Sequence, residues 1–334
     1  MNQTPSSLYQ KTWLEETPVV LREIVTGGMA GAVAKTSVAP LERCKILYQT
    51  GRLHHTGVIP TMRSIVRGEG VKGLFKGNGA SVLRIIPYSA IHFGLYEHFR
   101  RSFVGMVYGN RVPDSISTLI DLLAGSCSGA TAVILTYPLD IVRTRLAYIS
   151  EGGSIPVERG SAPPSVPMGQ HMTIRTVLRD TLTREGIRGL YRGIGPSIYG
   201  ILPYAGLKFF VYQDLKQMYH TRTQRDIQTT RLPVPVMLCF GGIAGLIAQT
   251  ATYPIDVVRR RMQVEGLQHV QDCGSLDLLP RSTPKALCRI AQNEGWRSLF
   301  NGLSINYMKV VPSTAIGFTL YDFLKSQLYL STNL

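Results

Sequence analysis

Long stretches without a charged residue alternate with charged segments along this chain. No charged residue stands between Asp121 and Asp140 or between Arg231 and Asp256, and each stretch reaches the length that a helix needs to cross a bilayer. Together with the motif spacing described next, this pattern predicts six long helices, at about 21–49, 78–104, 118–148, 194–218, 234–263 and 303–328. Shorter amphipathic helices are predicted near 57–68, 172–184 and 283–293.

Two motifs recur three times in the same order. The first is a proline with an acid two residues later and a base five residues later, in "APLERCK" from residue 39, "YPLDIVRTR" from 137 and "YPIDVVRRR" from 253. The second is an acid-glycine box, in "EGVKGLFKG" from 69, "EGIRGLYRG" from 185 and "EGWRSLFNG" from 294. Each box acid precedes a further proline by 18 residues, as Glu69 precedes Pro87. Constant order and spacing predict a bundle of three equivalent helical units.

These repeats divide the chain into an N-terminal tail and three units. The tail covers residues 1–20 and contains no apolar core of the signal-peptide type. The units cover residues 21–104, 118–218 and 234–328. The second and third units contain insertions at about 150–170 and 265–283, which are rich in Pro, Gly and Ser and are therefore expected to be loops.

Glycine pairs support the same register. They stand at equal distances before the three motif prolines: Gly27 and Gly31, Gly125 and Gly129, Gly241 and Gly245. Such Gly-x-x-x-Gly pairs allow helices to approach closely in lipid, so we expect close helix packing at these positions.

The composition narrows the classes of function. Lys and Arg outnumber Asp and Glu, 36 to 21, which gives a net charge of +15 and favours nucleic acid, an anionic membrane or an anionic small molecule as the partner. Aromatic residues do not cluster with basic ones as in RNA-binding proteins, so we expect no nucleic acid. The five cysteines form no Cys-x-x-Cys pair, so we expect no metal and no cofactor. No nucleophile with a base and no P-loop is recognisable, so we expect no enzyme.

The threefold signature of Pro-x-Asp/Glu-x-x-Lys/Arg and acid-glycine box resembles that of the mitochondrial carrier family over residues 21–328. The resemblance implies an all-α membrane protein, with six tilted transmembrane helices in a threefold pseudo-symmetric bundle and three short helices on the matrix side. It also implies a monomer in the lipid bilayer, in contact with cardiolipin, with both termini facing the intermembrane space. The mitochondrial inner membrane is favoured, and peroxisomal relatives share the signature.

Charged residues after the motif prolines resemble the matrix gate of that family. The prolines are expected to kink the odd-numbered long helices and bring their ends together. The acid of one helix would then pair with the base of the next, within the set Glu42, Lys45, Asp140, Arg143, Asp256 and Arg259. The family places a bracing glutamine nine residues after each proline; Gln49 and Gln263 occupy two of these positions and Ala147 the third. Ion pairs of moderate net stability suit a gate that must open.

A matching set begins nine residues after the even-helix prolines, in "YEHFR", "YQDLK" and "YDFLK", and resembles the cytosolic gate. Its members are Tyr96, Glu97, Arg100, Tyr212, Lys216, Tyr321, Asp322 and Lys325. Gln213 replaces an acid, so this gate is expected to be the weaker one. A single pair of this kind is usually an exposed pair at a helix end, but recurrence at fixed spacing favours gates.

Three positions stand three residues before the even-helix prolines: Arg84 in "LRIIP", Gly200 in "YGILP" and Lys309 in "MKVVP". Equal offsets predict equal depth in the bundle, and in the family these are substrate contact points. Cations at mid-depth are costly unless water or an anion reaches them, so they indicate an anionic ligand. The alternative is that they form structural ion pairs or extend along apolar surface to water.

Further candidate contacts surround this level. In carriers of adenine-containing substrates a glycine with a following aliphatic residue, here Gly200 and Ile201, resembles the adenine site, and Tyr204 is one turn further on. Lys35 occupies a position where adenine nucleotide carriers also have a lysine. Two residues five positions after the even-helix prolines would add positive charge to the cytosolic funnel: His92 and Lys208.

Segments such as "VAPLERCKILYQT", "KGNGASVLRIIPYSAIHF" and "YRGIGPSIYGILPYAGLKF" resemble the coenzyme A carriers, particularly those of plants. The stretch "RRRMQV" at 259–264 differs from the "RRRMMM" of ADP/ATP exchangers. The resemblance implies exchange of coenzyme A, or a related adenine-containing anion, against an adenine nucleotide. An adenine nucleotide carrier is the main alternative, and a proton-leak or non-transporting homologue is a further one.

Overall fold

The computed structural model describes residues 19–51, 57–107, 114–151, 165–166, 172–223, 233–268, 280 and 282–327. The long helices within these ranges are α2 (Val19–Gln49), α4 (Asn78–Val107), α5 (Asp114–Tyr148), α7 (Ile194–Thr223), α8 (Val234–Gln268) and α10 (Leu303–Gln327). The shorter ones are α3 (Val58–Gly73), α6 (Ile174–Leu190), α9 (Thr283–Glu294) and the 3-10 helix η1 (Trp296–Phe300). The helical class predicted from the sequence is confirmed for these ranges.

Several details differ from the sequence prediction. Three helices end five or six residues later than predicted: α3 at Gly73, α6 at Leu190 and α7 at Thr223. The two-residue strands β1 (Ser150–Glu151) and β2 (Ser165–Val166) pair in parallel and were not predicted. Helix α8 continues to Gln268, into the stretch expected to be the second insertion. Most of both insertions, near 150–170 and 265–283, and nearly all of the tail lie outside the described residues.

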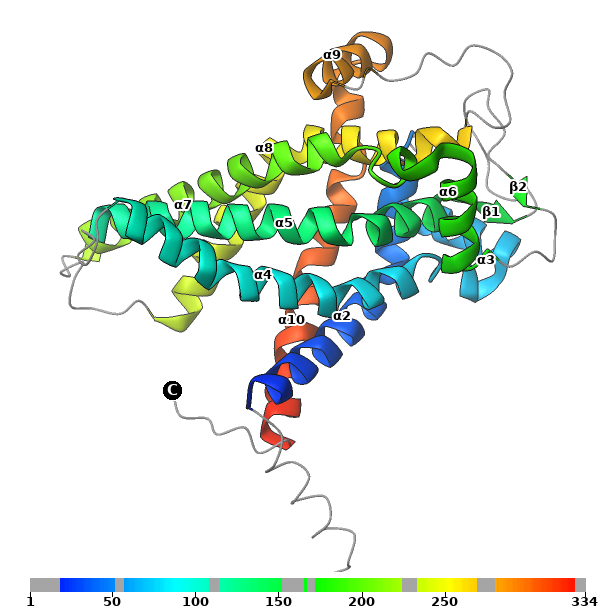
Figure 1. Cartoon of the computed structure of the whole chain (residues 1–334). Helices are drawn as coiled ribbons and strands as arrows, with labels where there is room; N and C mark the ends of the chain where they lie inside the picture. The colour runs from blue at the N-terminus through cyan, green and yellow to red at the C-terminus, as the bar shows by residue number, and fades with distance from the viewer. Residues whose placement is uncertain are drawn as a thin grey trace, which may run out of the picture.

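The long helices form a closed ring in the order α2, α4, α5, α7, α8 and α10 (Figure 1). The most extensive contacts join α4 to α5, α7 to α8, and α10 back to α2. In Figure 1, α4, α5 and α7 run side by side across the view, and α2 and α10 cross them. Because the first and last long helices pack together, all three units contribute to one continuous wall.

The acid-glycine boxes set the geometry of the short helices. Gly70, Gly186 and Gly295 have φ angles of 73°, 68° and 85°. These left-handed values strain any residue with a side chain, so the box requires glycine. Helical geometry is interrupted at Gly70 inside α3 and at Gly186 inside α6, and α9 ends just before Gly295.

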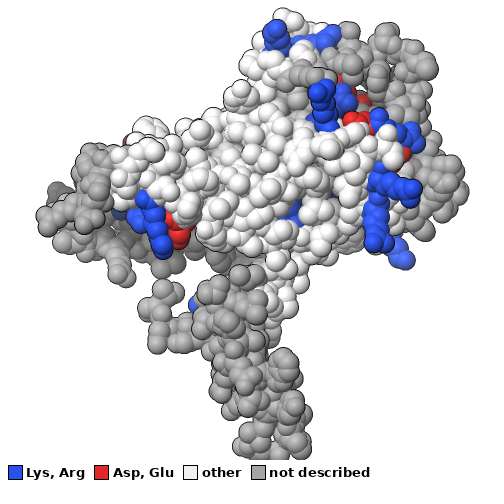
Figure 2. Space-filling view, viewed as in Figure 1, with Lys and Arg blue, Asp and Glu red and all other residues white. Residues whose placement is uncertain are grey.

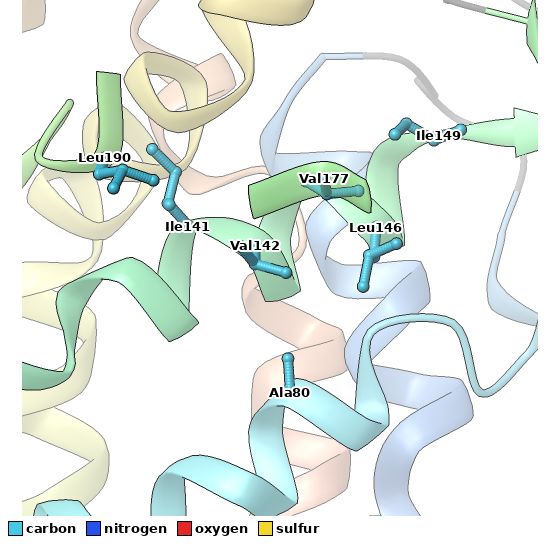
Figure 3. Packing of buried hydrophobic residues seen from close by; sticks show 7 residues of the cluster. All are labelled: Ala80, Ile141, Val142, Leu146, Ile149, Val177 and Leu190. Carbon is cyan, nitrogen blue, oxygen red and sulfur yellow. The ribbon is translucent and has the colours of Figure 1, made fainter. Parts of the chain in front are cut away.

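Apolar packing is concentrated where the short helices contact the long ones. One buried cluster joins α4, α5 and α6 (Figure 3) and consists of Ala80, Ile141, Val142, Leu146, Ile149, Val177 and Leu190. Related clusters include Leu47 with Ile65 between α2 and α3, and Val258 with Ile290 between α8 and α9. Full burial of each large aliphatic side chain contributes about 1.5–3 kcal/mol. The clusters therefore hold the C-terminal ends of α2, α5 and α8 in place.

The glycine pairs lie in the more loosely packed part of the bundle. At three of the six positions a Cβ atom would meet no other atom within 4 Å: Gly27, Gly241 and Gly245. At Gly125 and Gly129 it would be in ordinary contact with Tyr96 and His92, at 3.9 and 3.8 Å. A Cβ atom on Gly31 would lie 3.6 Å from Ile85, so in this conformation α4 contacts the second pair and Gly31, whereas Gly27 and the third pair face open space.

Candidate functional site

A ring of ion pairs joins the ends of α2, α5 and α8 just after their motif prolines. The three pairs are Lys45 Nζ with Asp256 Oδ2 at 2.9 Å, Arg259 Nη2 with Asp140 Oδ2 at 2.6 Å, and Arg143 with Glu42. The pairs join α2 to α8, α8 to α5 and α5 to α2, so they form a closed ring. We call these six residues the ion-pair ring.

Two glutamines donate hydrogen bonds to acids of the ring. Gln49 Nε2 donates to Asp256 Oδ2 at 2.9 Å, and Gln263 Nε2 donates to Asp140 Oδ2 at 2.9 Å. Ala147, at the equivalent position of α5, has no side-chain polar group to offer the Arg143–Glu42 pair. The ring is therefore braced at two of its three pairs.

Four further cationic side chains contact two acids of the ring, Asp140 and Glu42. Arg84 Nη1 of α4 lies 2.5 Å from Asp140 Oδ1, and Lys309 Nζ of α10 lies 3.3 Å from Glu42 Oε1. Lys35 Nζ of α2 lies 3.6 Å from the same Glu42 oxygen. Arg260, which the sequence analysis did not single out, lies 3.4 Å from Asp140 Oδ2. Three of the cations expected to contact a ligand are thus in direct contact with the ring.

The charges at this level do not balance. Three acids, Glu42, Asp140 and Asp256, are surrounded by seven bases. These bases are Lys35, Lys45, Arg84, Arg143, Arg259, Arg260 and Lys309. Seven positive against three negative charges leave an excess of four positive charges within this cluster. Such an excess inside a protein is stabilised by an anion.

A second ring of arginines supports the first. Arg43, Arg145 and Arg261 pair with the box acids Glu69, Glu185 and Glu294 at 2.7, 2.5 and 2.6 Å. Their Nε atoms donate to backbone carbonyl oxygens of α5, α8 and α2, at Ala147, Gln263 and Gln49 respectively. Ala147 and Gln49 lie in the last turns of α5 and α2, where carbonyl oxygens lack a donor within the helix, so Arg43 and Arg261 satisfy them. Gln263 lies inside α8, and its contact with Arg145 joins α8 to α5.

Sequence reasoning missed this second ring. Arg145 and Arg261 both stand seven residues after their motif prolines, a regularity that would have revealed them. In the first unit Leu47 takes that position, and Arg43 is one helical turn earlier. Because the arginine side chain is long, it reaches the box acid from either turn.

Glu69 illustrates the electrostatics of the second ring. Its side chain is fully buried between Arg43 and Lys76, whose Nζ lies 2.9 Å from Glu69 Oε2. Burial by itself would raise the pKa of Glu69, but the hydrogen bonds and positive charges of Arg43 and Lys76 together lower it to about 2. Glu69 is therefore ionised at neutral pH.

A cavity of about 440 Å³ lies beside the ion-pair ring, between α4, α5, α7 and α8. Four of the expected ligand contacts line it: His92, Gly200, Ile201 and Tyr204. Asp256 and Arg259 of the ring also line it, and Tyr88, Ser197 and Gln249 are further polar lining residues that sequence reasoning missed. Lys208 is exposed on α7 and does not line this cavity.

The residues expected to form the cytosolic gate are not joined in a ring. Arg100 Nε lies 2.6 Å from Asp121 Oδ1 of α5, and Glu97 pairs with Arg101 of its own helix at 3.9 Å. Lys325 lies over the Tyr321 ring, 5.9 Å from its centre. The remaining charged residues of the set are Lys216 and Asp322, and within the described ranges no ion pair links them to another of the helices α4, α7 and α10. Tyr96 and Tyr212 are half-buried. Of the two charged sets, only the one after the motif prolines is closed.

Comparison with known proteins places the three repeats in one family. The family described as "Mitochondrial carrier protein" matches residues 16–107, 114–223 and 230–331. The "Mitochondrial carrier protein CoAc2" of Zea mays is 47% identical over 312 residues, which cover 92% of this chain and 87% of that protein. The CoAc1 protein of Arabidopsis thaliana is 44% identical over 315 residues, 94% of this chain and 91% of its own. The "Mitochondrial adenine nucleotide transporter ADNT1" of the same plant is 37% identical over 322 residues, 92% and 87%.

Proposed function

Because the chain belongs to the mitochondrial carrier family, we propose that it transports an adenine-containing phosphorylated anion across the mitochondrial inner membrane, with coenzyme A as the leading substrate. The names of the relatives CoAc1 and CoAc2 support coenzyme A. The observation that carries the proposal is the excess of four positive charges at the ion-pair ring. Coenzyme A has three phosphate groups and carries about four negative charges at neutral pH, which matches this excess.

The surface supports a membrane location. Leu119–Tyr148 and Pro235–Glu265 are long and apolar enough to cross a membrane, by length and composition, among the residues described. Large apolar side chains on the other long helices are exposed, including Phe93 (71%), Phe210 (67%) and Val311 (73%). Figure 2 shows Lys and Arg gathered where α6 and α9 lie and a broad uncharged face over α4, α5 and α7. We infer six spans, a monomer with lipid and cardiolipin around it, and both termini in the intermembrane space.

Two of the other long helices, α4 and α10, have a physical reason for a lower mean hydropathy. Arg84 and Lys309 stand in the middle of α4 and α10 and contact ring acids rather than lipid. A helix with such residues on its inner face has a lower mean hydropathy, although its outer face is apolar. The six-span proposal therefore rests on the exposed apolar faces and the closed ring of helices.

The closed ion-pair ring is proposed to be the matrix gate, and the unpaired charged set at the other end the open cytosolic gate. The conformation described would then be open toward the intermembrane space. A phosphorylated anion that binds Arg84, Lys309 and Lys35 competes with Asp140 and Glu42 for them. Binding therefore exchanges the contacts of these cations with Asp140 and Glu42 for contacts with the anion, and the change of access follows from the difference in affinity between the two states.

An adenine nucleotide carrier is the second candidate, supported by the similarity to ADNT1. The Gly200–Ile201 slot suits adenine in either substrate, and the ring charges suit any multiply phosphorylated anion. The proton-leak alternative does not account for a cluster of cations at this level of the bundle. The counter-substrate is proposed to be an adenine nucleotide, because an empty cavity leaves its cations uncompensated.

Reconstitution into liposomes tests the proposal. We expect uptake of labelled coenzyme A into vesicles that are preloaded with ADP. Arg84→Ala and Lys309→Ala should each reduce uptake by at least about tenfold, since each removes a charge-assisted contact. Arg101→Ala is the matched control, because its side chain is 83% exposed. Robust ADP or ATP uptake without coenzyme A uptake would favour the second candidate.

A further inference from the structure

His92 is held by a hydrogen bond that determines which ring nitrogen carries its proton. Its Nδ1 lies 3.0 Å from Ser128 Oγ on α5. The Ser128 hydroxyl donates to the carbonyl oxygen of Gly125, 3.1 Å away, as serines in helices commonly do. Because a hydroxyl has one proton, forming both hydrogen bonds at once assigns Ser128 Oγ as the acceptor from Nδ1–H of His92. A neutral His92 therefore has an unprotonated Nε2, which is an acceptor.

The surroundings of His92 restrict its ring in other directions. A Cβ atom on Gly129 would lie 3.8 Å from both Nδ1 and Cε1, so this side of the imidazole packs on the glycine surface of α5. The ring also stacks on Tyr88, with ring centres 5.9 Å apart and an interplanar angle of 18°. No hydrogen bond to Nε2 occurs within the described part of the chain. The only ring nitrogen available to a ligand is thus one whose chemical character is fixed.

The cavity brings this acceptor to the proposed base-binding slot. His92 and Tyr88 of α4 and Gly200 and Ile201 of α7 line the same 440 Å³ cavity. From α5, Gly125, Gly129 and Val133 also line the cavity. A planar base on the Gly200–Ile201 surface would have its edge within the space that His92 borders.

We propose that His92 determines the base specificity of transport by accepting a hydrogen bond from the exocyclic amine of adenine at Nε2. The inference deepens the proposed function and rests on it. Guanine and hypoxanthine carry a carbonyl oxygen where adenine carries this amine, so acceptor would meet acceptor. A site built around one hydrogen bond rejects an analogue that leaves it unmade. Ser128 is a positioning residue, because it acts only through the proton on His92.

This role differs from the positive charge that the sequence suggested for His92. A neutral imidazole adds no charge, and the seven bases around the ring acids already supply the attraction for phosphates. Phosphate binding and base recognition are therefore assigned to different residues, which allows them to be measured separately.

Competition for uptake of labelled coenzyme A into proteoliposomes tests the inference. The competitors are two matched pairs that differ at C6 of the base, amine against carbonyl, and in the proton that the carbonyl form carries on N1: coenzyme A with its hypoxanthine analogue, and ADP with IDP. Uptake is measured at about pH 8, where an ordinary imidazole is neutral. For the unmodified protein we expect the amine member of each pair to compete about tenfold better, the effect of one hydrogen bond.

Three variants separate the roles. Ser128→Ala frees the imidazole to place its proton on Nε2, so the preference for the amine should fall to about twofold or less while uptake continues. His92→Phe keeps a ring against Tyr88 and should lose the preference equally. Ser126→Ala is the control, because the Ser126 hydroxyl bonds the Leu122 carbonyl on the same helix and does not line the cavity.

The outcomes distinguish the two proposals. Uptake with equal competition by both members of each pair overturns the role of His92 and leaves the proposed function standing. An unchanged preference in Ser128→Ala, with a reduced one in His92→Phe, overturns the role of Ser128. If the unmodified protein takes up neither labelled coenzyme A nor labelled ADP, both the function and the inference fail.

Discussion

Gln263 and Gln49 occupy equivalent positions under the ion-pair ring, yet their side chains are satisfied to different extents. Both are fully buried. Gln263 Nε2 donates to Asp140 Oδ2 at 2.9 Å and to the Tyr137 hydroxyl at 3.0 Å. Its Oε1 accepts from Arg260 Nη1 at 2.9 Å and lies 2.8 Å from Thr144 Oγ1. Gln263 therefore uses its full hydrogen-bonding capacity.

Gln49 is less completely used. Its Nε2 donates to Asp256 Oδ2 at 2.9 Å, but its buried Oε1 has no partner among the described residues. A hydrogen bond to a charged group is worth about 1.5–3 kcal/mol and a neutral one about 1 kcal/mol. Truncating Gln263 removes two bonds to charged groups and two neutral ones, whereas truncating Gln49 removes one charged bond and one neutral bond to Tyr253. The difference is one charged and one neutral bond, so we expect Gln263→Ala to cost about 3 kcal/mol more than Gln49→Ala.

Thermal denaturation of the purified protein measures this difference. A difference of about 3 kcal/mol corresponds to a difference of about 6 °C in denaturation midpoint for a chain of this size. Gln217→Ala on the exposed face of α7 is the control and should leave the midpoint unchanged. Equal shifts for the two ring glutamines, or a larger shift for Gln49→Ala, would refute the reasoning, because hydrogen-bond satisfaction would then not determine the strength of a brace.

Three further perturbations test other parts of the structure. Lys45→Asp should abolish uptake by placing two acids together, and adding Asp256→Lys should restore part of it, as transport by the single and double variants will show. Gly186→Ala should lower the denaturation midpoint through about 1–2 kcal/mol of strain at a φ of 68°, whereas Gly206→Ala within α7 should leave it unchanged or raise it. The pKa of Glu69 is lowered to about 2 from its ordinary value of about 4.5, so its stabilising contribution is complete above about pH 4.5 and is lost as the pH falls toward 2. The midpoints of the unmodified protein and of Glu69→Gln should therefore differ at pH 6 and converge near pH 2.

Sequence periodicity located the elements well because it reflects contacts that each unit makes locally. The short helix α9 was predicted at 283–293 and is found at Thr283–Glu294, since its glycine stop and apolar face are both visible in the sequence. The end of α8 was predicted five residues too early. A helix end set by neighbouring segments leaves no comparable local signal.

Side-chain partners were harder to predict. The offsets placed Arg84 and Lys309 at one level, but not on Asp140 and Glu42, because that contact depends on how the helices tilt toward one another. Arg43 was missed because it stands one helical turn earlier than Arg145 and Arg261 do in their units. Its side chain is long enough to contact Glu69 from that position. The hydrogen bond between His92 and Ser128 joins residues 36 positions apart, and no motif connects them.

The sequence by itself determined the six long helices of the described ranges, their order, the threefold repetition and the types of charge at each level, because all of these are written in residue spacing and composition. Only the tertiary structure decided which charged set is closed, which acids hold the additional cations, and which ring nitrogen of His92 contacts Ser128. These features depend on distances of a few ångströms between side chains from different helices. Such distances follow from the packing of the whole ring of helices, and no single segment of the chain encodes them.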